Sequence, residues 1–92
     1  MAVGRAERRS EREPLVAAFF DEDQTPRALD LLELTELAWH DCYGEVTPSE
    51  DVIDDLLTVS GGSINGLIQA ARLAVTDPRD LKIAAEERRN PT

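Results

Sequence analysis

Residues 47–78 read TPSEDVIDDLLTVSGGSINGLIQAARLAVTDP, which is the pattern of two helices joined by a glycine turn. Apolar side chains recur at three- and four-residue spacing on either side of Gly61-Gly62, as they do along one face of a helix. Ser63, directly after the glycines, is a residue type that caps helix N-termini. The segment therefore predicts one helix over 48–59 and a second over 64–75.

Three prolines follow directly on a residue type that caps helices, in Thr25-Pro26, Thr47-Pro48 and Asp77-Pro78. The cap oxygen accepts an unpaired backbone N–H, and the fixed φ of proline suits the first helical turn. Glu50 stands three residues after Thr47 and completes a capping box. These signals predict helix starts near residues 26, 48 and 78.

The remaining elements complete an all-α fold, a compact bundle of four to five short helices. Residues 1–12 carry four arginines and little to bury, and we interpret them as a flexible charged arm. Pro14 is expected to begin a short apolar helix that includes Leu15–Phe20. Residues 13–89 form the single helical domain, and 90–92 form a C-terminal tail. With 41% hydrophobic but only 4% aromatic residues, the core must consist mainly of aliphatic side chains.

The helix predicted over 26–43 ends at Gly44, because glycine is the residue type that most often stops a helix. Its apolar face covers about half its circumference. Either neighbouring helices enclose this face completely or it supports a homodimer. In the helix over 64–75, Gly66 and Ala70 lie one turn apart, and we expect small residues at this spacing to let another helix approach closely.

The net charge of −9 disfavours nucleic acids and anionic membrane surfaces as partners and favours basic proteins. Cys42 is the sole cysteine, so no intramolecular disulfide is expected, and we interpret it as a half-buried structural thiol. The charged N-terminus shows no apolar signal core, and no segment has the roughly 20 apolar residues that span a bilayer. These features predict a cytoplasmic protein.

Glu33, Glu36 and His40 fall within one narrow arc of the helix over 26–43. A Glu and a His four residues apart can both bind a metal ion, which makes a metal-dependent enzyme one alternative. A transition-metal site usually needs three or four protein ligands, and His40 is the only histidine. We therefore favour a solvent-facing Glu36–His40 pair, with no metal, no cofactor and no catalytic residue.

The two helices around Gly61-Gly62 also resemble a helix-turn-helix unit, which makes a DNA-binding regulator another alternative. The exposed side of its second helix would present Asn65, Gln69 and Arg72 to bases. The acidic residues of the preceding helix would approach phosphates, however, and DNA binders normally show a basic stripe.

The helix over 48–59 divides into an apolar face and an acidic face, the latter formed by Glu50, Asp51, Asp54 and Asp55. Such a face is commonly no more than solvated surface, but acidic surfaces also recognise basic proteins. The leading hypothesis is a non-enzymatic protein–protein interaction module that binds another protein through these four carboxylates and through exposed apolar surface.

The segment LIQAARLAVTDPRDL, residues 67–81, resembles the C-terminal part of small acidic helical proteins of actinobacterial type. Those proteins have no assigned function. The resemblance covers the last third of the chain and implies a helical domain without implying any site residue.

Overall fold

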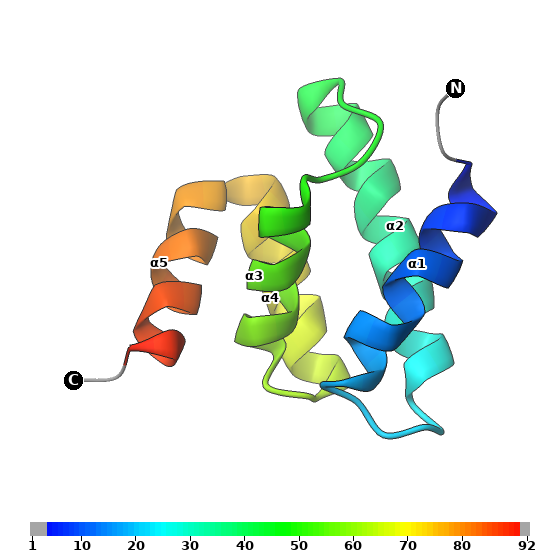
Figure 1. Ribbon diagram of the computed structural model, residues 1–92. Coiled ribbons are helices and arrows are strands. Elements are labelled where there is room, and N and C mark those ends of the chain that lie inside the picture. The colour runs from blue at the N-terminus through cyan, green and yellow to red at the C-terminus, as the bar shows by residue number, and fades with distance from the viewer. Residues whose placement is uncertain (1–3, 91–92) are drawn as a thin grey trace.

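The computed structural model describes residues 4–90, and within them the chain folds into five helices with no strand. The predicted all-α fold is confirmed. The helices form a globule with principal extents of 43 × 31 × 21 Å (Figure 1). Their bounds are α1 Arg5–Ala17, α2 Thr25–Tyr43, α3 Glu50–Ser60, α4 Ile64–Thr76 and α5 Pro78–Arg89.

Three of the predicted helix signals are confirmed by the geometry. The Ser63 side chain accepts the backbone N–H of Gly66 at 2.9 Å, and the Asp77 carboxylate accepts those of Arg79 and Asp80. Gly44 ends α2 with a φ of 73°, in the left-handed region that favours glycine. These signals are local, so they act within a few residues of where they stand.

The two threonine caps are wrong. The N-cap of α3 is Ser49, whose hydroxyl accepts the Val52 N–H at 3.4 Å, and α3 begins at Glu50 rather than at Pro48. The Thr47 hydroxyl instead accepts a hydrogen bond from Arg12 at 2.6 Å, so no capping box forms. Thr25 is already inside α2, and its hydroxyl donates to the carbonyl of Asp21.

The flexible arm predicted for residues 1–12 is also wrong over the part that the structure describes. Residues 5–12 form most of α1, and Pro14 lies inside this helix rather than in its first turn. An interior proline removes a helical hydrogen bond, so α1 requires tertiary contacts to hold it. Val16 and Arg12 supply them, because both are buried. Residues 1–3 of the arm and 91–92 of the tail lie outside the described residues.

The core is formed by side chains from all five helices, and α4 packs against α2, α3 and α5. Pairwise contacts link α1 to α2, α2 to α4, and α5 to both α3 and α4, so α1 and α5 flank opposite sides of the molecule (Figure 1). Apart from Pro48, the largest fully buried side chains are aliphatic, as the composition predicts, and come from all five helices: Val16, Leu32, Ile53, Leu56, Leu57, Leu67 and Leu81. This packing leaves one side of α2 without a covering helix.

Helix α4 buries only part of its apolar face. Leu67, Ala70 and Ala74 are fully buried, whereas Ile68 and Val75 are only half-buried at the surface beside α2. Gly66 does not serve helix–helix approach as expected. A Cβ at Gly66 would overlap the carbonyl oxygen of Ser60, because the turn from α3 folds directly over the first turn of α4.

Candidate functional site

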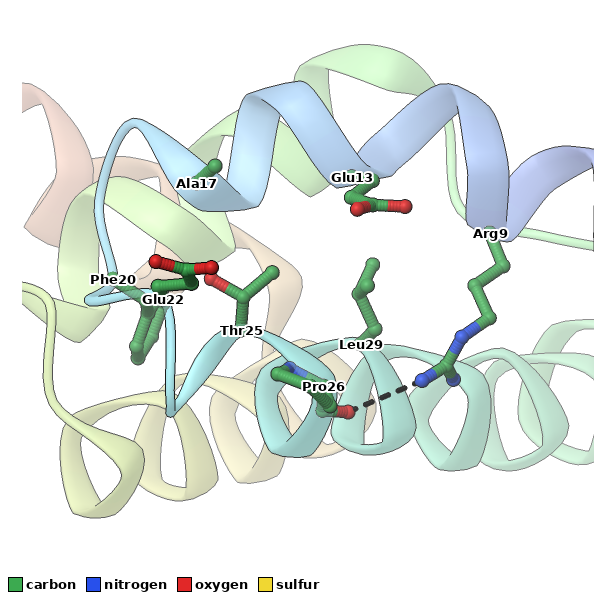
Figure 2. Close-up of a pocket in the computed structure, with 8 residues that line it drawn as sticks. All are labelled: Arg9, Glu13, Ala17, Phe20, Glu22, Thr25, Pro26 and Leu29. Atoms are coloured by element: carbon green, nitrogen blue, oxygen red, sulfur yellow. Dashed lines mark hydrogen bonds between the residues drawn. The ribbon is translucent and has the colours of Figure 1, made fainter.

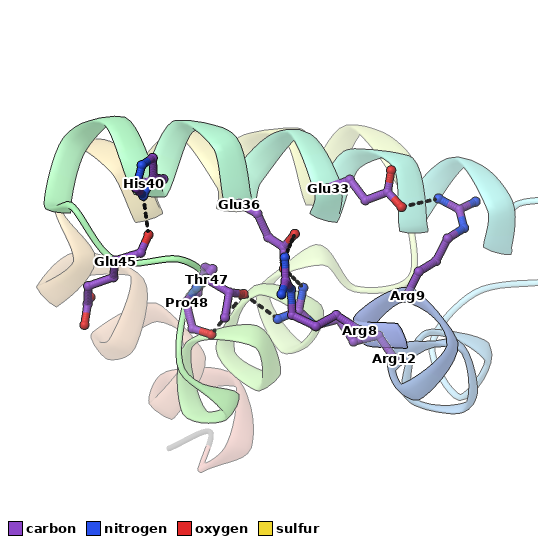
Figure 3. Close-up of polar contacts among 9 residues, drawn as sticks. All are labelled: Arg8, Arg9, Arg12, Glu33, Glu36, His40, Glu45, Thr47 and Pro48. Carbon is purple, nitrogen blue, oxygen red and sulfur yellow. Dashed lines mark hydrogen bonds and ion pairs between the residues drawn. The ribbon is translucent and has the colours of Figure 1, made fainter. Parts of the chain in front are cut away.

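A buried carboxylate joins α1 to α2 and to the loop before α3. Glu36 is only 3% exposed. Its Oε1 atom accepts hydrogen bonds from Arg8 Nε at 2.6 Å and from Arg12 Nη1 at 2.8 Å. Arg12 Nη2 donates to the Thr47 hydroxyl, so the network spans three segments (Figure 3). We call Arg8, Arg12, Glu36 and Thr47 the Glu36 network.

The charge balance of the network keeps Glu36 ionised. Burial by itself would raise the pKa of Glu36, but the hydrogen bond from Arg8, the neighbouring Thr47 and the positive charge of Arg12 outweigh it. The pKa of Glu36 consequently lies below its ordinary value of 4.5. A carboxylate held in this way fixes structure and is a poor proton acceptor near neutral pH.

Arg9 makes a second, more exposed set of contacts one turn away along α2. It binds Asp30 at 2.8 Å and Glu33 at 3.1 Å and also donates to the Pro26 carbonyl. The three arginines therefore point from α1 toward the acidic side of α2. Sequence analysis missed this pairing, although a signal was present: the arginines repeat at helical spacing, as do the acids at 30, 33 and 36.

A cleft of about 480 Å³ opens between the N-terminal half of α2 and the C-terminal half of α1 (Figure 2). Figure 2 shows Glu13 on α1 above Leu29 of α2, Glu22 beside Phe20 and Thr25, and the Arg9 side chain donating to the Pro26 carbonyl. The lining is Arg9, Glu13, Ala17, Phe20, Glu22, Thr25, Pro26 and Leu29. It combines carboxylates with apolar walls and contains no cysteine or histidine.

The structure separates the three residues that suggested a metal site. Glu33 pairs with Arg9, Glu36 with Arg8 and Arg12, and the His40 ring contacts the Glu45 carbonyl at 3.1 Å (Figure 3). The expected solvent-facing Glu36–His40 pair is therefore wrong, because Glu36 is buried. Within residues 4–90, no three His, Cys, Asp or Glu side chains gather as a metal-binding group.

The predicted acidic face of α3 is present but smaller than expected. Glu50, Asp51 and Asp54 are exposed, but the predicted surface position of Asp55 is wrong, because this residue is buried. Arg89 of α5 binds Asp55 at 2.8 Å and Asp54 at 2.7 Å. Because the sequence pattern alone could not show that α5 packs beside α3, it placed Asp55 on the surface.

The helix-turn-helix candidates Asn65, Gln69 and Arg72 are all exposed on α4, as expected. The basic N-terminal segment that could have contacted phosphates is bound to α2 instead, through Arg8, Arg9 and Arg12. Cys42 differs from its prediction, since it is an exposed free thiol.

An apolar groove runs between α2 and α4. Its volume is about 210 Å³, and it is lined by Leu31, Leu34, Thr35, Ala38, Ile68, Ala71, Arg72 and Val75. Leu34 on its edge is 60% exposed, and the neighbouring Leu37 is 48% exposed. The broad apolar face of α2 is thus not completely enclosed by the helices of its own chain.

Comparison with family models, with curated proteins and with solved structures finds no match to this chain. None of the helices within residues 4–90 has the length and hydrophobicity needed to cross a lipid bilayer. The arrangement itself therefore supplies the basis for a functional proposal.

Proposed function

We propose that this chain is a non-enzymatic protein–protein interaction domain that recognises a basic protein through the acidic surface of α3. The observation that supports the proposal is that basic side chains of α1 and α5 pair with acids of the same chain. Arg8, Arg9 and Arg12 bind acids of α2, and Arg89 binds acids of α3, within the fold. Internal pairing of these bases leaves unpaired carboxylates on the exterior of a chain whose net charge is −9.

Glu50 and Asp51 are the residues on which recognition would depend. Both are exposed, and neither has an ion-pair partner within residues 4–90. They lie in the first turn of α3, on a rigid element whose other face is buried in the core. Side chains on such an element lose little freedom on binding, which favours recognition. Asp54 borders them and already shares Arg89.

The test is affinity capture from cells that express the protein natively, with the partner identified and its binding then measured in purified form. The variant Glu50→Lys/Asp51→Lys is expected to weaken binding of the captured partner at least tenfold, because rim charges act through electrostatic complementarity. The matched control is Glu7→Lys/Glu11→Lys on the exposed side of α1, which changes the net charge equally. Equal loss in both double variants would show that overall acidity, and not the α3 surface, governs binding.

The DNA-binding alternative has its own test. We expect no binding of a labelled DNA duplex of mixed sequence, measured by fluorescence anisotropy at about 20 mM salt, where electrostatic attraction is least screened. Saturable binding that is lost on Arg72→Ala would instead support the helix-turn-helix interpretation and contradict the acidic-surface proposal.

A further inference from the structure

The solvent-facing side of α2 carries a charge pattern that is complementary to itself. Arg27, Leu34 and Asp41 follow one another at seven-residue spacing, so they lie along one line of the helix. The leucine is at the centre, with a cation seven residues before it and an anion seven residues after it. All three side chains are exposed.

The two charged side chains at the ends of this line form no ion pair within the described part of the fold. Neither Arg27 nor Asp41 has a hydrogen-bond or ion-pair partner in the part of the chain that the structure describes. They differ in this respect from Asp30 and Glu33 on the neighbouring side of α2, which bind Arg9. An unpaired cation and an unpaired anion thus flank an exposed leucine.

From this arrangement we propose that α2 is a homodimerisation surface, on which a second copy packs antiparallel about a twofold axis at Leu34. In a twofold interface, residue i of one chain meets residue j of the other and j meets i. An axis at Leu34 brings Arg27 to Asp41 of the second copy at both ends of the helix pair. The same register places Leu34 opposite itself at the axis.

The groove between α2 and α4 provides the receiving surface for this second helix. Its lining comes from both helices, and six of its eight residues are aliphatic: Leu31, Leu34, Ala38, Ile68, Ala71 and Val75. Thr35 and Arg72 complete it. Burying Leu34 there would remove one of the most exposed large apolar side chains from water. The surface is separate from the acidic residues of α3, so dimerisation does not depend on the function proposed above.

The experiment measures the oligomeric state of the full chain by sedimentation equilibrium at about 150 mM salt, which screens the repulsion between two acidic copies. We expect a reversible dimer with a dissociation constant below about 500 µM, a range reached by modest interfaces. Leu34→Asp is expected to weaken association at least tenfold. The control Ile83→Asp, which changes an exposed apolar residue of α5 in the same way, is expected to leave association unchanged.

A charge exchange tests the antiparallel register. Arg27→Asp and Asp41→Arg should each weaken the dimer about fivefold, because each places like charges together at both ends. The double variant Arg27→Asp/Asp41→Arg should restore association to within about twofold of the wild type. A wild-type chain that stays monomeric at 500 µM would overturn the proposal, and so would a double variant that is weaker than either single one. Circular dichroism of each variant establishes that it is folded.

Discussion

Replacing Glu36 with alanine is expected to lower the free energy of unfolding by about 3 kcal/mol, because it removes the carboxylate that balances the buried charge of Arg12. Arg12 is only 5% exposed, so water cannot readily replace the lost carboxylate. Arg8 retains some access to solvent, which places the expected loss at the lower end for a broken buried ion pair. Chemical denaturation followed by circular dichroism measures the change.

The matched control for this prediction is Glu33→Ala on the same helix. Glu33 also binds an arginine, but both partners of that pair are about one-third exposed, so its loss should cost less than about 1 kcal/mol. Similar losses of unfolding free energy for Glu33→Ala and Glu36→Ala would show that the burial of the Glu36 network adds nothing to stability.

The pH dependence of the stability of Glu36→Gln shows whether the contribution of Glu36 comes from its charge, because glutamine has nearly the same size and shape. Because the pKa of Glu36 is lowered in the folded state, its contribution is fully present above the ordinary value of 4.5 and disappears as the pH falls through the lower folded value. The stability difference between wild type and Glu36→Gln should therefore be largest near neutral pH and shrink below about pH 4.5. A difference that is the same at both extremes would contradict the electrostatic origin.

Features that depend on neighbouring residues could be predicted from the sequence. Ser63, Asp77 and Gly44 act on backbone groups within four residues, and the structure places helix ends at all three. The aliphatic core of α3 was likewise visible, because helical periodicity requires only the local chain. These signals were sufficient for the number and order of the helices α2 to α5.

Features that depend on distant residues could not be predicted in this way. Thr47 was assigned to a cap, but Arg12, thirty-five positions away, takes its hydroxyl. Asp55 was assigned to the surface, but Arg89 covers it. The helix α1 was missed for the same reason. Its arginines bind carboxylates of α2 that lie more than twenty positions away in the sequence. Charged side chains are stable both in solvent and in ion pairs, so their identity alone does not show which environment they occupy.

Gly66 is the position where the smallest substitution should have a large effect. Alanine in place of a helical glycine normally stabilises a helix by about 1 kcal/mol. At Gly66 the added Cβ would overlap the Ser60 carbonyl oxygen and lie 2.8 Å from the Ser63 hydroxyl that caps α4. The Ser60 oxygen belongs to the backbone and accepts hydrogen bonds from Ser63, so it cannot move without disturbing the turn.

We therefore expect Gly66→Ala to destabilise the protein by about 2 kcal/mol, since overpacking outweighs the gain in helix propensity. For a domain of this size, such a loss lowers the melting temperature by roughly 10 °C, which thermal denaturation detects easily. Asn65→Ala is the matched control, because Asn65 is the exposed neighbour in the same turn and should gain a few tenths of a kcal/mol. If Gly66→Ala were as stable as Asn65→Ala, the turn between α3 and α4 could not lie as close to α4 as the structure places it.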